Sequence, residues 1–288
     1  MPRTDFFINV PRANKDGKER EIMSVNWIDV RSLSFNTLLL LEREQISWFP
    51  GWLPEKELSV ALNGNPTVTW YLQHKCPEIK EWVTEVLTRA EGESSAVELR
   101  ESEVAVMNAI NDLLVYVIDP ARYDRLPFLN WEDKELTGLV ELQGKVVIDV
   151  GAGTGRLTFL AAGEGAAAVF AVEPVGNLRR YIKEKAREKG FKNIFPVDGL
   201  ITEIPLPDSF ADICLGGHVF GDEPEPEYLE MTRVTKPGGM VALIPGNDDR
   251  DEGWHDFLVE KGFQWSRFME PSDGWKRKYW KVHQSATG

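Results

Sequence analysis

The chain is poor in the residues that build disulfide frameworks and metal sites. Its 288 residues include two cysteines and four histidines. Cys76 and Cys214 lie far apart and form no CxxC pair, and the histidines complete no spacing that is typical of metal ligands. We therefore expect neither a disulfide framework nor a bound metal.

Positive charge is also scarce. There are 33 lysine and arginine residues against 46 aspartate and glutamate residues, which gives a net charge of -13. Proteins that bind nucleic acid or anionic membranes need a basic surface to displace counterions, so this composition argues against both partners. No apolar run approaches the length that spans a membrane, and the first twenty residues lack the apolar segment of a secretory signal. We expect a soluble, cytoplasmic protein.

The second half of the chain has the pattern of a parallel sheet covered by helices, because β-rich runs alternate with helical stretches from Gln143 onward. Strands are expected at residues 145–150, 167–172, 193–197, 211–215 and 240–244, the last after a KPGG turn. Helices are expected at residues 156–162, 177–189 and 226–234. Two further runs, 263–269 and 276–282, flank a Pro-Ser-Asp-Gly turn and should pair as an antiparallel hairpin. This pattern predicts the α/β class.

The first half is mainly helical by the same criteria. A helix is expected from Pro77, and its apolar face includes Trp82. A second runs from about residue 97 to 118 and ends before Pro120, and a short third begins at Asn130. Residues 22–41 are β-rich without a clear register. We predict two domains, with a mainly helical N-terminal cap at residues 1–135 and an α/β domain at residues 136–288.

The stretch VVIDVGAGTGRL, residues 146–157, carries the most specific motif. A strand that ends in glycines before a helix brings backbone amides next to a ligand, since side chains would obstruct the approach. Dinucleotide sites need G-x-G-x-x-G, but the position of the third glycine is occupied by Arg156. The spacing here is G-x-G-x-G, which disfavours a nicotinamide oxidoreductase. Arg156 is expected to fix the loop by pairing with a nearby acid.

The order D-x-G-x-G-x-G resembles the first motif of the class I S-adenosylmethionine-dependent methyltransferases. Later landmarks follow in the family's order: FAVEP with Glu173, PVDGL with Asp198, LPDSFADICLGGHVF and VTKPGGMVALI. The resemblance extends from Gln143 to His283 and is closest to the small-molecule branch that includes ubiquinone and menaquinone enzymes. It implies a Rossmann-like, doubly wound seven-stranded sheet with one reversed strand.

The resemblance also implies the cofactor, S-adenosyl-L-methionine, and its product, S-adenosyl-L-homocysteine. Glu173 lies about 20 residues beyond the glycines, as ribose recognition requires, and a carboxylate can accept from both ribose hydroxyls. Asp198 is expected near the adenine amino group. The full set of predicted cofactor-binding residues is Asp149, Gly151, Ala152, Gly153, Thr154, Gly155, Glu173, Pro174, Asp198, Gly199, Leu200 and Gly216.

The chemistry needs few catalytic groups. The methyl group of a sulfonium is already activated, so the protein mainly aligns the acceptor and excludes water. His218 is the candidate catalytic residue, as a base or as a group that orients the acceptor, and a purely structural role is an equal alternative. Tyr123 and Trp131 are predicted to line a lid over the cofactor. The charges of Asp222 and Glu223 are expected to be solvated.

Two alternatives stay open beside a small-molecule methyltransferase, apart from the disfavoured nicotinamide oxidoreductase. The same fold acts on protein or RNA in other proteins, although no Asn-Pro-Pro-Tyr type motif follows the fourth strand. A regulatory protein could keep the cofactor site without turnover. The run WKRKYWK, residues 275–281, mixes cations with aromatics as single-stranded nucleic-acid binders do, but on a terminal hairpin we expect its lysines to protect an exposed edge. The sequence indicates neither the acceptor nor the oligomeric state.

Overall fold

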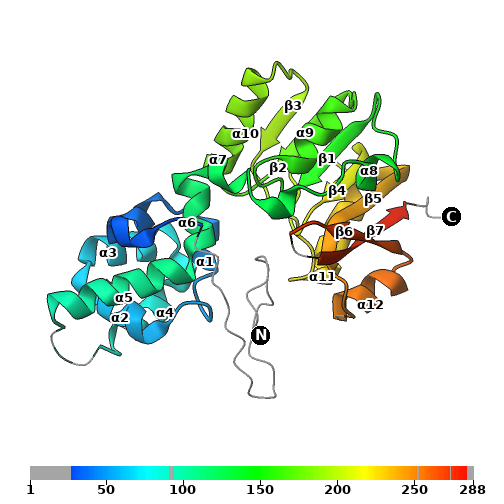
Figure 1. The fold of residues 1–288 in the computed structure, drawn as a ribbon. Coiled ribbons are helices and arrows are strands. Elements are labelled where there is room, and N and C mark those ends of the chain that lie inside the picture. Colours follow the sequence, from blue (N-terminus) through cyan, green and yellow to red (C-terminus); the bar gives the residue numbers. More distant parts are fainter. Residues whose placement is uncertain (1–26, 91, 93, 252, 273, 284–288) are drawn as a thin grey trace. The chain divides into compact units, whose positions relative to one another are not determined.

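The computed structural model describes residues 27–90, 92, 94–251, 253–272 and 274–283, and these form two compact units (Figure 1). The N-terminal unit ends at Tyr123, and the sheet unit begins at Asp124. The predicted domain boundary lies twelve residues later, between residues 135 and 136. The division of the chain into two functional domains stays a prediction.

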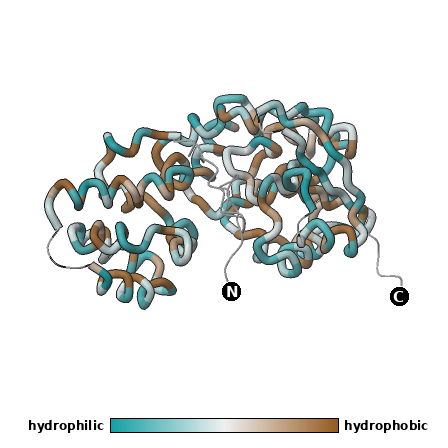
Figure 2. Tube along the Cα trace, turned by 60° about the horizontal axis from the view of Figure 1, so that its bottom comes forward, coloured by the Kyte–Doolittle hydropathy of each residue, from teal (hydrophilic) through white to brown (hydrophobic). Residues whose placement is uncertain are grey.

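The N-terminal unit is built from helices, which confirms a helical N-terminal region. Its elements are η1 (Val30–Ser32), η2 (Phe35–Leu40), α1 (Arg43–Ser47), α2 (Glu55–Gly64), α3 (Pro66–Lys75), η3 (Pro77–Ile79), α4 (Lys80–Leu87), α5 (Ala96–Ala109), α6 (Asn111–Ile118) and α7 (Pro120–Tyr123). Figure 2 shows hydrophobic and hydrophilic segments alternating along these helices, as expected where one face of each helix is buried. Leu38, Leu58 and Met107 are fully buried in this unit.

Three local expectations for this half of the chain are wrong. Residues 27–41 form short 3-10 helices and no strand, because the Asn111 side chain occupies both backbone groups of Ile28 and Ser34 caps η2; residues 22–26 lie outside the described part. The helix expected over 97–118 is divided at Ile110, where the backbone leaves the helical region. The helix expected from Asn130 begins only at Lys134 as α8 (Lys134–Thr137).

The sheet unit has the predicted Rossmann-like architecture. Its seven strands lie in the order β3-β2-β1-β4-β5-β7-β6, and only β7 is reversed. The strands are β1 (Val146–Val150), β2 (Ala168–Val172), β3 (Ile194–Val197), β4 (Ala211–Gly216), β5 (Thr235–Asp248), β6 (Gln264–Glu270) and β7 (Gly274–Val282). The connecting helices are η4 (Pro127–Leu129), α8, α9 (Arg156–Gly163), α10 (Gly176–Glu188), α11 (Pro224–Val234) and α12 (Gly253–Glu260).

Helices cover both faces of this sheet, with α9 and α10 on one face and α11 and α12 on the other (Figure 1). Successive residues of a strand point to opposite faces, so Val147 packs in the layer of α9 while Ile148 packs in the layer of α11. Strand β1 pairs with both β2 and β4, and this is where the strand order reverses. Ligands of open α/β sheets bind at the carboxyl ends of the strands at such a point.

Two details of the C-terminal strands correct the sequence analysis. The KPGG sequence does not precede β5 but lies within it as a bulge, with Gly238 in the left-handed region at a φ of 80°. Residues 275–281 lie in β7, between β5 and β6, so they do not form the sheet edge. Lys276, Arg277 and Lys278 of this run are buried and ion-paired, so they do not protect an exposed strand.

Candidate active site

The glycine loop, defined as residues 151–155, connects β1 to α9 and has an unusual backbone. Gly151, Gly153 and Gly155 have φ values of 65°, 55° and 89°, which residues with a Cβ rarely adopt. A Cβ on Gly151 would lie 2.3 Å from a methyl group of Val219, so the loop after β4 packs directly on it. A Cβ on Gly153 would meet no atom within 4 Å. The middle of the loop is therefore open to a ligand.

Glu173 follows β2 and holds this loop from one side. Its Oε2 accepts a hydrogen bond from the Gly153 amide at 2.8 Å, and its Oε1 accepts from the Val175 amide at 2.9 Å. Only 5% of the residue is exposed, and burial raises the pKa of its carboxyl group to about 7. Each carboxylate oxygen keeps acceptor capacity beyond these two bonds.

Asp149 lies beneath the loop, at the end of β1. Its Oδ2 accepts from the Thr158 hydroxyl on α9 at 2.5 Å, and the residue is 1% exposed. Burial raises the pKa of Asp149 to about 7. The structure thus gives Asp149 a place between β1 and α9, and its predicted contact with a cofactor stays a prediction.

Asp198 follows β3 and is held by an arginine that the sequence analysis missed. Arg179 on α10 donates from Nη1 to the Asp198 carboxylate at 2.8 Å and to the Glu173 carbonyl at 2.6 Å. The Asp198 side chain remains 73% exposed. Gly199 packs closely on Val172 and Pro205, which leaves no space for a side chain. A cation in the first turns of the helix after β2 is the sequence signal that could have indicated Arg179.

Two other predicted cofactor-binding residues lie near these acids in sequence, and their role stays a prediction. Pro174 lies between Glu173 and Val175, and Leu200 pairs with Glu203 in an isolated bridge.

The loop after β4 approaches the glycine loop from the other side. A Cβ on Gly216 would lie 2.7 Å from Val219, the same residue that covers Gly151. His218 has a φ of 53°, its backbone amide donates to the Pro245 carbonyl at 2.9 Å, and its ring meets Phe128 edge to face. The fold therefore brings His218 to the carboxyl edge near the glycines, while its chemical role stays a prediction.

The other candidates have different surroundings. Trp131 is 3% exposed and packs on Phe268 in the core, a position that does not favour a lid. Tyr123 belongs to the N-terminal unit, where its ring meets Tyr116, and its lid role stays a prediction. Asp222 is half-buried, which corrects the expectation of a solvated charge.

Arg156 pairs with an acid, as predicted. Its Nη2 lies 2.5 Å from Oδ1 of Asp133.

The residues present fit the cofactor that the sequence implies. Among the residues the structure describes, the buried Thr154 hydroxyl in the glycine loop has no hydrogen-bond partner. The open face of Gly153 and the spare acceptor capacity of Glu173 adjoin it. A ribose diol and a polar amino-acid group would satisfy these atoms.

Comparison with known proteins identifies this part of the chain. Residues 148–243 match the family model described as a methyltransferase domain. This part of the chain is similar to a methyltransferase domain. The matched residues run from β1 through β5 and include the glycine loop, Glu173, Asp198 and His218.

Similar proteins carry the same kind of domain. The histone-arginine methyltransferase CARMER of Drosophila persimilis is 33% identical over 116 residues, which are 39% of this chain and 22% of that protein. The probable histone-arginine methyltransferase CARMER of Drosophila melanogaster shows the same identity and coverage. The chain thus spans about a fifth of the length of these relatives. A solved SAM-dependent methyltransferase from Aquifex aeolicus superposes with a TM-score of 0.45 at 23% identity, covering 57% of this chain and 99% of that one.

In the described part of the chain, no helix is both long and apolar enough to cross a membrane.

Proposed function

We propose that this chain is an S-adenosylmethionine-dependent methyltransferase that transfers a methyl group to a small-molecule acceptor by direct displacement. The observation that carries the proposal is the glycine loop, which is open above Gly153 and is flanked by the buried carboxyl group of Glu173. The methyltransferase-domain match over the same residues supports it.

The residues of the chain have distinct tasks in this proposal. Glu173 would accept hydrogen bonds from the ribose hydroxyls, and Asp198, held by Arg179, would accept from the adenine amino group. The amides of the glycine loop and the Thr154 hydroxyl would hold the amino-acid end. When bound, the cofactor supplies an activated methyl group. The chain then only aligns the acceptor and excludes water. His218 would orient the acceptor, since the next residue, Val219, packs on Gly151 of the glycine loop.

A protein acceptor is the second candidate, and the similarity to histone-arginine methyltransferases favours it. That similarity covers 116 residues. In our proposal the acceptor is chosen above all by the N-terminal unit. The narrower likeness to quinone methyltransferases stays a hypothesis about the acceptor.

Calorimetry tests the cofactor assignment first. We expect S-adenosylhomocysteine and S-adenosylmethionine to bind and NAD to bind weakly or not at all. Transfer of labelled methyl from S-adenosylmethionine is then compared between histone proteins and a panel of small phenols, amines and thiols. NAD binding without binding of S-adenosylhomocysteine would overturn the proposal, and labelling of histones alone would replace the small-molecule acceptor with a protein.

A further inference from the structure

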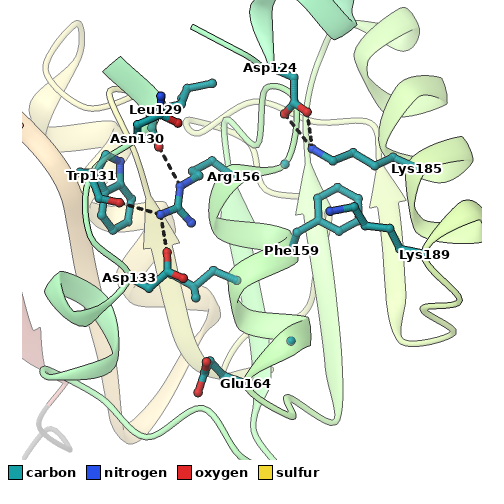
Figure 3. Close-up of a pocket in the computed structure, with 13 residues that line it drawn as sticks. Asp124, Leu129, Asn130, Trp131, Asp133, Arg156, Phe159, Glu164, Lys185 and Lys189 are labelled. Carbon is teal, nitrogen blue, oxygen red and sulfur yellow. Dashed lines mark hydrogen bonds and ion pairs between the residues drawn. The ribbon is translucent and has the colours of Figure 1, made fainter. Parts of the chain in front are cut away.

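A short segment before β1 is fastened to the glycine loop at two points. We call residues 124–133 the strap; it contains η4 and belongs to the sheet unit. Figure 3 shows its two attachments, one around Arg156 and one between Asp124 and Lys185. Both cations lie beside the glycine loop, one directly after it in sequence and one on α10.

The first attachment is formed by two nitrogens of the Arg156 guanidinium, Nε and Nη2. Its Nε donates to the Leu129 carbonyl at 2.9 Å, and its Nη2 donates to the Trp131 carbonyl at 2.9 Å. The same Nη2 pairs with Asp133, and the guanidinium stacks on the Trp131 ring at 4.3 Å. A planar guanidinium suits such forked contacts, which a lysine could not reproduce. Since Arg156 directly follows Gly155, these bonds fix the end of the glycine loop.

The second attachment begins at the first residue of the strap. Lys185 donates to both carboxylate oxygens of Asp124, at 2.7 and 2.6 Å, and Tyr181 donates to Oδ2 at 3.0 Å. The Lys185 ammonium also lies 3.5 Å from the carbonyl oxygen of Thr154, inside the glycine loop. Burial is the largest influence on Lys185 and lowers its pKa, in spite of the Asp124 carboxylate.

A groove of about 590 Å³ lies between the strap and helices α9 and α10. Its lining includes Trp131, Arg156, Phe159, Lys185 and Lys189 (Figure 3). Arg156 and Lys185 are not available to a bound anion, because both already bond to carbonyl and carboxylate groups of this chain. The groove is therefore better explained as the junction of strap and loop than as a ligand site.

We propose that Arg156 and Lys185 are positioning residues, which hold the glycine loop through the strap in the shape that binds the cofactor. The inference rests on the proposed function. Glu173 fixes the loop through the Gly153 amide. Arg156 ties the end of the loop to the strap, and Lys185, which is held by Asp124 of the strap, contacts the Thr154 carbonyl. A loop that is already ordered loses less conformational entropy when a ligand binds, so these bonds raise affinity without touching the ligand.

Amide hydrogen exchange of residues 151–156 in the ligand-free protein tests the strap directly. Arg156→Gln removes the first attachment, Asp133→Asn weakens it by removing the ion pair, and Asp124→Asn weakens the second. Asp133 is largely exposed, so its variant should fold even if Arg156→Gln does not. We expect exchange of the loop amides to become about tenfold faster in each, as for the loss of a hydrogen bond to a charged group.

A matched control is available on the other face of the sheet. Arg233 on α11 likewise donates to two backbone carbonyls, of Ile204 and Leu206, and pairs with Asp208. Arg233→Gln should cost comparable global stability but leave exchange of residues 151–156 unchanged. Equal acceleration in both variants would mean general destabilisation and would overturn the inference.

Binding of S-adenosylhomocysteine gives the second readout. We expect the Kd to rise about tenfold in Arg156→Gln and to stay within about twofold of the wild type in Arg233→Gln. Faster loop exchange with an unchanged Kd would contradict the positioning role. If wild-type protein does not bind S-adenosylhomocysteine at all, the proposed function fails, while the exchange comparison still decides whether the strap orders the loop.

Discussion

The carboxyl ends of β1 and β2 and the middle of β7 both bury charged side chains, but they surround them differently. Lys276, Arg277 and Lys278 of β7 are each less than 10% exposed, and each pairs with a carboxylate. Asp149 and Glu173 are buried to the same extent, yet they accept hydrogen bonds only from neutral hydroxyl and amide groups. The buried charges of β7 are thus matched, in that each is paired with a carboxylate. The carboxyl groups beside the glycine loop are unmatched, in that neutral groups donate their hydrogen bonds.

The pKa directions follow this difference. Burial alone would lower the pKa of Arg277, but its bonds to Asp249 and Asp251 outweigh burial and hold the pKa above the ordinary value. Burial raises the pKa of both Asp149 and Glu173, and the nearby Arg179 guanidinium lowers the pKa of Glu173 by less than burial raises it. Glu227 repeats the second pattern after β4, where its buried carboxylate accepts from the Gly221 and Glu223 amides.

We infer that the matched charges of β7 stabilise the fold and that the unmatched carboxyl groups beside the glycine loop, Asp149 and Glu173, serve a ligand. Carboxyl groups with strongly perturbed pKa values gather at functional sites more often than elsewhere. The four predictions below change one region at a time, so that stability and ligand affinity can be separated.

Arg277→Met should have the largest effect, on stability alone. Removing one partner of a buried pair leaves the other without compensation, and we expect a loss of about 3 kcal/mol in the free energy of unfolding. Urea denaturation measures this loss. The Kd for S-adenosylhomocysteine should stay within about twofold of the wild type. Binding about tenfold weaker would contradict the inference that the charges of β7 affect stability alone.

Glu173→Gln should act on affinity instead. The amide group cannot accept from both Gly153 and Val175, and it also offers a poorer acceptor to a ribose. We expect S-adenosylhomocysteine to bind about 2 kcal/mol more weakly, roughly thirtyfold in Kd. Glu227→Gln removes a similar carboxylate from the loop after β4 and is the control. Equal losses in both variants would deny Glu173 a specific role.

The affinity should also depend on pH. The pKa of Glu173 is about 7, so its proton must leave before both oxygens can accept, and S-adenosylhomocysteine should bind more tightly as pH rises from 6 to 8. The stability of the ligand-free protein should change in the opposite direction. The pKa of Glu173 is higher in the folded state than the value of 4.5 expected when it is unfolded, so its contribution to stability is fully present below pH 4.5. This contribution is lost as the pH rises through about 7. Asp149 shifts in the same direction. Calorimetry measures the affinity and urea denaturation measures the stability at both pH values. In Glu173→Gln, both quantities should depend much less on pH.

His218→Asn should have the smallest effect if alignment carries the reaction. Asparagine tolerates a positive φ, so the substitution preserves the backbone at 53°. We expect turnover to fall less than about tenfold once an acceptor is known, since a general base contributes roughly 10²- to 10⁴-fold. A loss above a hundredfold, with disappearance of a titration near pH 6.5, would make His218 the base.

Much of the sheet unit could be predicted because its signals are local. The glycines, the strand-helix alternation and the spacing to Glu173 are all contained in short stretches, and the structure has the predicted seven-stranded sheet with one reversed strand. The pairing of Arg156 with an acid was also predictable, since a long cation beside a tight loop needs a partner.

The errors arise where distant residues decide the outcome. Residues 27–41 read as β-rich, but Asn111, more than 70 residues away, takes the backbone groups of Ile28 that a strand would use. The cations of β7 read as an exposed edge because the sequence does not show that β6 lies outside β7. The sequence likewise does not show that Trp131 contacts Phe268 and Arg156 in the core, and its lid role stays a prediction.

A crystal structure of the protein with S-adenosylhomocysteine tests the central claim most directly. We expect the ribose hydroxyls within hydrogen-bond distance of the Glu173 carboxylate and the purine beside Asp198, with the glycine loop close to its present shape. A ligand bound instead in the groove lined by Trp131, Arg156 and Lys189, or a ribose that does not contact Glu173, would contradict the assignment of the unmatched carboxyl groups to the cofactor.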